Sequence, residues 1–121
     1  NIPSLLSVPY IDPEETSYNR SIWENTYAWI WSTNNPHFYR GKAAEGIGSP
    51  HTPRHYIWPM SLVIRGMVDP TAREEMISAV QSTMVRGKLH ESFHKDNAHR
   101  LTREDFSWPN ELFKELLAIH I

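Results

Sequence analysis

Apolar residues recur along this chain at the spacing of α-helices, and no segment alternates convincingly between apolar and polar residues as a β-strand does. Four helices are predicted, each with its apolar positions on one face. They cover residues 14–32, 56–67, 71–85 and 107–119. A short helical turn is also expected at residues 4–8. The pattern therefore predicts an all-α fold.

The connections between these helices differ greatly in length. Two are long, residues 33–55 and 86–106, whereas the one between them is a tight break at Asp69-Pro70. If successive helices run antiparallel, both long loops emerge at the same end of the array. They hold most of the glycines and histidines. Because long loops in compact domains usually carry function, we expect a site on that face.

Composition and charge exclude several classes of protein. The chain has 121 residues, of which 40% are hydrophobic, and a formal net charge of −2. No basic stripe indicates a nucleic-acid partner, and no apolar run is long enough to span a membrane. Without cysteine there is no disulfide and no thiolate metal site. Because the first residue is Asn1 and no signal peptide follows, we expect the sequence to start inside a longer protein.

The first long loop combines glycine, proline and fixed polar groups. Gly46 and Gly48 permit unusual backbone angles or the close approach of a ligand, and the prolines after them stiffen the chain. The polar side chains held there are Glu45, Ser49, His51 and Thr52. Together with the aromatic face of Trp58 they suit a sugar, which needs hydrogen bonds and a stacking surface. An ordered structural loop explains the same residues equally well.

The second long loop contains the zinc-peptidase pattern His-Glu-x-x-His, from His90 through Glu91 to His94. On a helix this spacing puts two imidazoles on one face, with the glutamate as the base. Gly87 before the pattern and polar residues after it make a long helix improbable there, and a third ligand is ambiguous. A pair of surface histidines is the simpler alternative. Arg103 either orients a carboxylate or caps the last helix.

Several of these segments resemble glycoside hydrolase family 125, whose members are metal-independent, exo-acting α-1,6-mannosidases. The most specific match runs from Asn35-Pro36-His37-Phe38-Tyr39 through Gly41-Lys42-Ala43-Ala44-Glu45-Gly46-Ile47-Gly48-Ser49-Pro50-His51-Thr52-Pro53 to Tyr56-Ile57-Trp58. Others are Asn1 to Tyr10, His90-Glu91-Ser92-Phe93, Thr102-Arg103, Phe106-Ser107-Trp108 and Asn110-Glu111-Leu112-Phe113. The stretch Met84-Val85-Arg86 departs from the family pattern and puts the local support of the second loop in doubt.

The resemblance implies a fold, a mechanism and a site. The fold would be an (α/α)6 barrel, with residues 1–121 forming the C-terminal, incomplete part of one catalytic domain as its last helical hairpins. The mechanism would be inverting, with Glu91 as general base, an upstream aspartate as general acid, and neither metal nor cofactor. The expected substrate-binding residues are Glu45, Ser49, His51, Trp58, His90 and Arg103.

The expected partners are a mannose-containing oligosaccharide, such as one of N-glycan type, and the remainder of the catalytic domain. Two rival functions stay open. One is a zinc metallopeptidase that uses His90, Glu91 and His94, and the other is a non-catalytic helical module that binds a partner through both loops. If the domain is incomplete, the faces toward its missing helices would be apolar and rich in Trp and Tyr.

Overall fold

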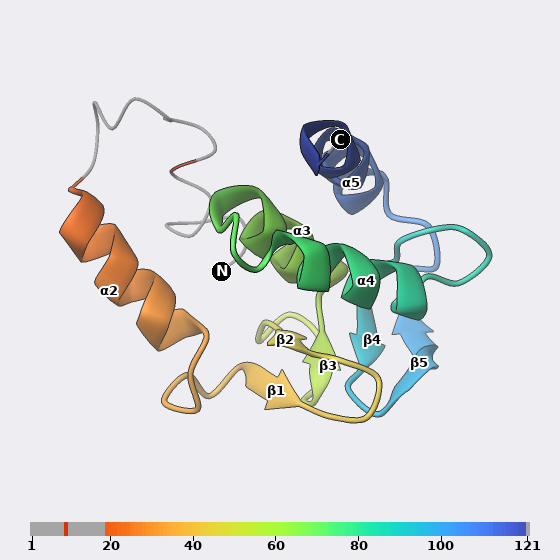
Figure 1. Ribbon diagram of the computed structural model, residues 1–121. Coiled ribbons are helices and arrows are strands. Elements are labelled where there is room, and N and C mark those ends of the chain that lie inside the picture. Colours follow the sequence, from red (N-terminus) through yellow and green to blue (C-terminus); the bar gives the residue numbers. More distant parts are fainter. Residues whose placement is uncertain (1–8, 10–18, 121) are drawn as a thin grey trace.

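The computed structural model describes residue 9 and residues 19–120, and its elements form layers (Figure 1). The helices in this part are α2 (Arg20–Ile30), α3 (Pro59–Val68), α4 (Arg73–Thr83) and α5 (Ser107–His120). The strands are β1 (Phe38–Arg40), β2 (Glu45–Ile47), β3 (Tyr56–Ile57), β4 (Ser92–His94) and β5 (Asn97–Thr102). Helices α3 and α4 lie side by side between the strands and α5, while α2 stands apart. The helical turn expected at residues 4–8 lies outside the described residues.

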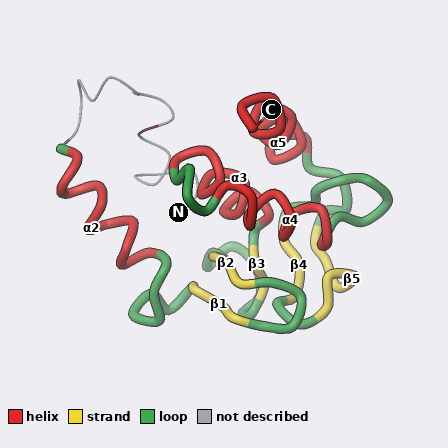
Figure 2. Tube along the Cα trace, viewed as in Figure 1, coloured by secondary structure: helices red, strands yellow, loops and turns green. Residues whose placement is uncertain are grey.

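The prediction of an all-α fold, formed by the last helical hairpins of an (α/α)6 barrel, is wrong, because the described chain is mixed α/β with two antiparallel sheets. Strands β1 and β2 form an antiparallel hairpin, and β3, β4 and β5 form an antiparallel sheet in that order. Figure 2 shows both sheets on one side of the helices. Most strands were missed because they have only two or three residues, and β3 also pairs with a strand that is distant in sequence. Ile57 pairs with Phe93, for example, a contact that no local pattern reveals.

Helix α3 begins at Pro59, so the prediction of a helix from residue 56 is wrong at its start. Proline favours extended backbone in the residue before it, and Trp58 has φ −89° and ψ 120°. Tyr56 and Ile57 therefore continue as a strand that leads directly into the helix. Proline at the first helical position costs no hydrogen bond. Trp58 is thus the single residue between strand β3 and helix α3.

The other helix ends are set by local chemistry as well. The Asn19 side chain accepts hydrogen bonds from the backbone N–H groups of Ser21 at 2.9 Å and Ile22 at 3.2 Å, so α2 begins at Arg20. The start expected at residue 14 lies outside the described residues. Helix α4 ends at Thr83, two residues early. A two-residue turn follows, in which Arg86 (φ 54°) and Gly87 (φ 72°) both have positive φ.

Helix α3 is the centre of the packing. Nine of its ten residues are buried, and only Arg65 is half-exposed. One side packs with α4, α5, Ile57 and Phe93, and the other packs with Trp23 of α2 and with the first hairpin. The Cβ of any larger residue at Gly66 would lie 2.9 Å from the Leu116 side chain, so glycine lets α5 approach closely. No helix in the described part has the length and apolar character needed to cross a bilayer.

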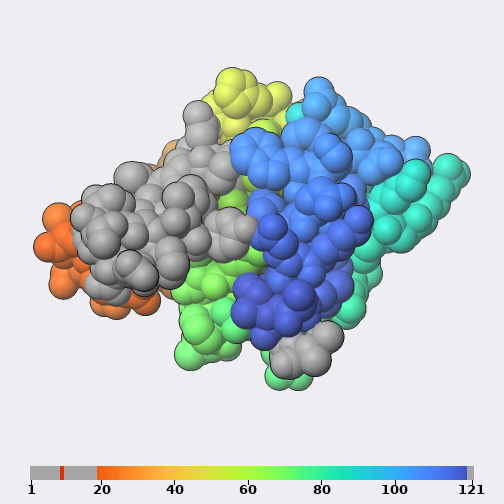
Figure 3. Space-filling model, turned by 90° about the horizontal axis from the view of Figure 1, so that it is seen from above, coloured from red at the N-terminus to blue at the C-terminus, as the bar shows by residue number. Residues whose placement is uncertain are grey.

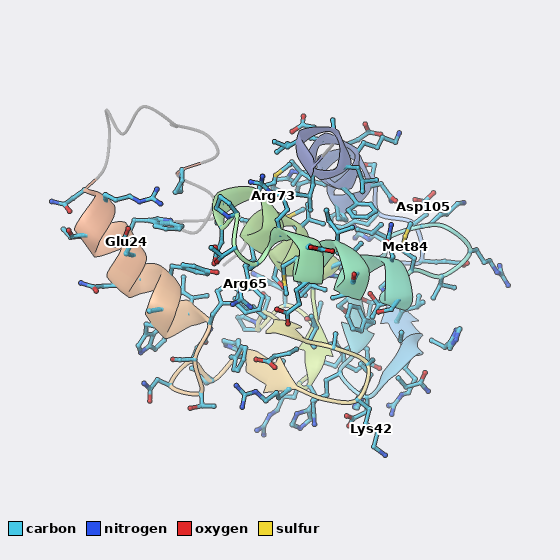
Figure 4. The ribbon with its side chains drawn as sticks, in the orientation of Figure 1. Glu24, Lys42, Arg65, Arg73, Met84 and Asp105 are labelled. Carbon is cyan, nitrogen blue, oxygen red and sulfur yellow. The ribbon has the colours of Figure 1, made fainter. Side chains whose placement is uncertain are left out.

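Tyr27 ties α2 to the turn after α3. Its hydroxyl donates to the Asp69 carboxylate and accepts from Arg65 Nε at 2.8 Å, and Figure 4 shows Arg65 on the side of α3 toward α2. Burial, together with the bond to Asp69, raises the pKa of Tyr27 to about 12.

Tyr27→Phe is expected to lower the free energy of unfolding by about 1–2 kcal/mol in denaturant titrations. Tyr56→Phe is the control, and an equal loss there would contradict the role of the hydroxyl.

Candidate active site

The two long segments lie side by side, although they are built from strands rather than loops. Strand β3 at the end of the first segment pairs with β4 of the second, and Lys95 N donates to His55 O at 2.9 Å. At the hairpin turn, Lys42 N donates to Asp96 Oδ1 at 2.9 Å. Figure 3 shows the turn near residue 50 (yellow) beside the segment near residue 100 (light blue). Residues far apart in sequence therefore share one edge.

Gly48 is required by the packing of the chain itself. A Cβ at this position would lie 2.2 Å from Tyr56 O and 2.9 Å from the Tyr39 ring. The group that closely approaches Gly48 is thus the backbone of β3 and not a ligand, which agrees with the alternative of an ordered structural loop. The tight contact fixes the course of the chain immediately before Ser49.

Polar residues line up at the end of the three-stranded sheet where β4 begins. Ser92 pairs with Thr102, and extending the β3–β4 register by one residue places Trp58 opposite Ser92. Residues opposite each other on antiparallel strands project to the same face. Glu91 directly precedes this row. Trp58 directly follows β3 and Glu91 directly precedes β4, so the pairing of these two strands places both residues at the same end of the sheet.

Glu91 is held by its backbone and by one of its two carboxylate oxygens. Its N–H donates to the carbonyl oxygens of Thr102 at 3.2 Å and Arg103 at 3.1 Å. Oε1 accepts from Thr102 Oγ1 at 3.1 Å. Among the residues that the structure describes, none donates to Oε2. The side chain is half-buried, with one oxygen anchored and the other without a partner in the described part of the chain.

The last helix supports this segment from behind. Asn110 accepts from Leu89 N at 3.0 Å through Oδ1 and donates to Leu89 O at 3.1 Å through Nδ2. Phe106 N also donates to Leu89 O, at 3.0 Å. The amide thus pairs with Leu89 as a neighbouring strand would, two residues before Glu91. This support answers the doubt raised by the departure from the family pattern at residues 84–86.

His90, the residue before Glu91, is buried. Its side chain is 1% exposed, and its ring meets the Phe93 ring edge to face at a centroid distance of 5.4 Å. Neither ring nitrogen has a hydrogen-bond partner among the described residues. Burial lowers the pKa of His90 to about 4, although the charge of Glu104 opposes this shift. The imidazole is therefore neutral at neutral pH.

Acid should destabilise the protein through His90. Its ordinary pKa is 6.5 and its folded pKa is about 4, so the unfolded chain takes up the proton first as the pH falls. The stability given by the neutral ring is complete above pH 6.5 and is lost progressively toward pH 4, with a loss on the order of 3 kcal/mol. His90→Leu should flatten the pH dependence of unfolding over this window, whereas exposed His99→Gln should not. Identical curves for both variants would contradict this account.

In the first segment, Ser49, Thr52 and Trp58 form one connected turn. Ser49 O accepts from Thr52 N at 3.2 Å, and Ser49 Oγ accepts from His51 N at 3.2 Å. Trp58 Nε1 donates to Thr52 Oγ1 at 2.9 Å. Ser49 is buried, Trp58 is half-buried and His51 is exposed. The turn thus orients the indole and presents the imidazole to the surface.

Two other expected site residues are engaged elsewhere. Glu45 forms an ion pair with Arg40 across the first hairpin, with 3.3 Å between Oε1 and Nε. The Arg103 guanidinium lies over the Phe106 ring, 5.1 Å from its centroid. Arg103 has positive φ, 45°, and its carbonyl oxygen rather than its charge contacts Glu91. Hairpin pairing and ring stacking account for these two side chains within the described residues.

The zinc-peptidase alternative does not fit the geometry. The pattern from His90 to His94 requires a helix, but the segment enters strand β4. In a strand, residues four apart are separated by about 13 Å, too far for two ligands of one ion. His94 Nδ1 accepts instead from Asp96 N at 3.1 Å. Within the described residues no group of three or more His, Cys, Asp or Glu could hold a metal.

The sequence argument missed two residues that contact the Glu91 segment, Thr102 and Asn110. Both stand in segments that resemble the family, but their roles depend on a hairpin register and on a contact between residues 89 and 110. A serine on one strand and a threonine on the next give no local signal that they will be paired. Only the folded chain reveals this support.

Similar proteins are known both by sequence and by structure. A structure described as a Streptococcus pneumoniae metal-independent α-mannosidase in a non-productive complex with α-1,6-mannobiose is 37% identical, with a TM-score of 0.86 over 99% of this chain and 28% of that one. The Meiotically up-regulated gene 157 protein of Schizosaccharomyces pombe is also 37% identical, over 97% of this chain and 23% of its own length.

These relatives are much longer than the chain, which spans about a quarter of their length. The family model described as metal-independent alpha-mannosidase (GH125) matches residues 1–118, nearly the whole sequence. The similarity thus includes both long segments, the strands built from them and the last helix. The chain belongs to the family of metal-independent α-mannosidases, glycoside hydrolase family 125.

Proposed function

We propose that the protein containing this chain is a glycoside hydrolase that removes terminal α-1,6-linked mannose from oligosaccharides by an inverting mechanism, and that the chain supplies Glu91 as the general base. The family match over residues 1–118 carries this proposal. The solved relative described with α-1,6-mannobiose supports the substrate class. The half-buried carboxylate with one anchored oxygen supports the role of Glu91.

The chain acts, on this proposal, as the C-terminal part of a larger catalytic domain. It spans about a quarter of its relatives, and large apolar side chains are exposed on α2 and α5. The exposed fractions are 65% for Ile22, 50% for Trp29, 48% for Trp108 and 50% for Ile119. Such surfaces are suited to being covered by further helices. By itself the chain would lack the general acid and be inactive.

The mechanism follows from how the carboxylate is held. In an inverting hydrolase the base takes a proton from a water molecule that attacks the anomeric carbon, while an acid on the opposite face protonates the leaving oxygen. The two carboxyl groups are about 6.5–9.5 Å apart, which leaves room for the water. Glu91 Oε1 is bonded to Thr102, so Oε2 is the oxygen placed to accept the proton. The acid would be an aspartate upstream of this chain.

The turn of the first segment would contribute to binding the sugar. Trp58 is fixed through Nε1 and lies beside the row that leads to Glu91, where an indole face suits the C–H face of a mannose ring. Ser49 and His51 lie in the same turn and would offer hydrogen bonds to hydroxyl groups. Glu45, His90 and Arg103 would act by shaping the surroundings of the pocket.

The proposal is tested with the full-length protein and α-1,6-mannobiose, following the anomeric protons by NMR. An inverting reaction releases β-mannose first, and prior treatment with a chelator should leave the rate unchanged. Initial release of α-mannose would overturn the inverting mechanism, since that anomer retains the configuration of the substrate. A chelator-sensitive rate would overturn metal independence. The absence of hydrolysis would favour the rival, a non-catalytic interaction module.

A further inference from the structure

We propose that Thr102 is a positioning residue for the reaction, backed by Ser92, and that these two hydroxyl groups together fix the Glu91 carboxylate. This inference rests on the proposed function, because it assigns to Glu91 the role of base. Thr102 acts through the Glu91 carboxylate and is not itself a catalytic residue.

The single proton on each hydroxyl group fixes the direction of the two hydrogen bonds among Ser92, Thr102 and Glu91. Thr102 Oγ1 donates its single proton to Glu91 Oε1 at 3.1 Å. Ser92 Oγ lies 2.5 Å from Thr102 Oγ1, and since the Thr102 proton is already engaged, Ser92 must be the donor. The chain of bonds therefore runs from Ser92 through Thr102 to the carboxylate. Each hydroxyl fixes the rotation of the next group.

The pair is rigid because both residues belong to a sheet and the serine is shielded from water. Ser92 and Thr102 are paired residues of β4 and β5, and the Ser92 side chain is 0% exposed. Phe93 beside Ser92 is also fully buried in the core. The threonine is β-branched, so its χ1 angle is restricted. The hydroxyl that meets Glu91 therefore comes from a fixed position.

The functional consequence lies in the last torsion angle of glutamate. Rotation about the bond that carries the carboxylate is broad and roughly two-fold, so an unrestrained carboxylate exchanges its oxygens and samples many angles. A bond to Oε1 removes this freedom and keeps Oε2 aimed at the water. A small misplacement of a catalytic group can cost about 100-fold in rate. We therefore expect Thr102 to affect turnover more than substrate binding.

The test compares variants of the full-length protein on α-1,6-mannobiose. Thr102→Val keeps the shape and the β-branch but removes the hydroxyl, and should lower kcat about 10- to 100-fold with little change in KM. Thr102→Ser restores the donor and should stay within about 3-fold of the wild type, because the bond to Oε1 can form again. Equal losses for the two variants, or a loss confined to KM, would overturn the proposal.

A double variant separates positioning from folding. Thr102→Val alone leaves the buried Ser92 hydroxyl without an acceptor and lowers the melting temperature. Ser92→Ala with Thr102→Val removes both groups, so the melting temperature should recover while kcat stays low. Recovery of kcat along with the melting temperature would show that the pair is only structural.

A second background tests the dependence on Glu91. In a Glu91→Gln protein, Thr102→Val should cause no further loss of turnover, because the carboxylate it positions is gone. A further loss as large as in the wild-type background would overturn the proposal. If instead Glu91→Gln is itself fully active, the assignment of the base has failed, and the two failures are thereby distinguished.

Discussion

Glu91→Gln in the full-length protein is expected to lower kcat for α-1,6-mannobiose by about 10²–10⁴-fold, the usual contribution of a general base. The amide cannot accept a proton from water, but its oxygen still accepts the hydrogen bond from Thr102. The backbone bonds of residue 91 to the carbonyl oxygens of Thr102 and Arg103 are unaffected. KM and the melting temperature should therefore change little.

The matched control for this experiment is Glu111→Gln. Glu111 is exposed on α5, where it pairs with Lys114 at 3.2 Å, and it is assigned no part in the site. It should retain full turnover. Unchanged turnover of the Glu91 variant would remove Glu91 from the role of base. Equal losses at both positions would point to a general effect of removing a charge.

Gly48→Ala is expected to destabilise the protein by about 3 kcal/mol, since a new methyl group would meet backbone and not a flexible side chain. The added Cβ would lie 2.2 Å from Tyr56 O, and β3 would have to move to accept it. Because β3 is joined to α3 through Trp58 and Pro59, the shift would reach the core and the turn of Ser49 together. Both the melting temperature and turnover should fall.

Gly87→Ala serves as the comparison. Gly87 has φ +72° and no atom within 4 Å of an added Cβ, so the substitution carries backbone strain of about 1–2 kcal/mol without a clash. Denaturant titration of both variants should give the larger loss for Gly48→Ala. A loss at Gly48 no greater than at Gly87 would show that β3 yields easily, and that the close approach does not constrain the site.

The positions of the helices could be predicted because their apolar residues recur at helical spacing or, in α3, form a nearly continuous apolar run. Their ends were less predictable, since they depend on single residues such as Asn19 and Pro59. The strands could not be predicted in this way. Strand β5 is largely exposed and polar, and it exists because β4 pairs with it on one side and with β3 on the other. The free energy that stabilises β5 therefore comes from contacts with other strands, which its own sequence does not reveal.

The candidate site likewise combines residues that the sequence could single out with residues that it could not. Glu91 stands in a recognisable motif, so the sequence alone could single it out. The partners that hold it could not be found in this way, because Thr102 reaches it through a hairpin register and Asn110 reaches Leu89 from 21 positions away along the chain. Glu45 was singled out by its place in the first segment, but its partner Arg40 depends on the register of β1 and β2.

Through the hydrogen bonds between Asn110 and Leu89, helix α5 supports the Glu91 segment without supplying a reacting group. Proteolytic removal of the chain from Ser107 onward would leave Glu91 in the polypeptide but abolish turnover. The reason is that the backbone of Leu89 would lose its hydrogen-bond partner Asn110. A peptide corresponding to α5, supplied separately, would be a natural candidate to restore turnover to such a shortened enzyme.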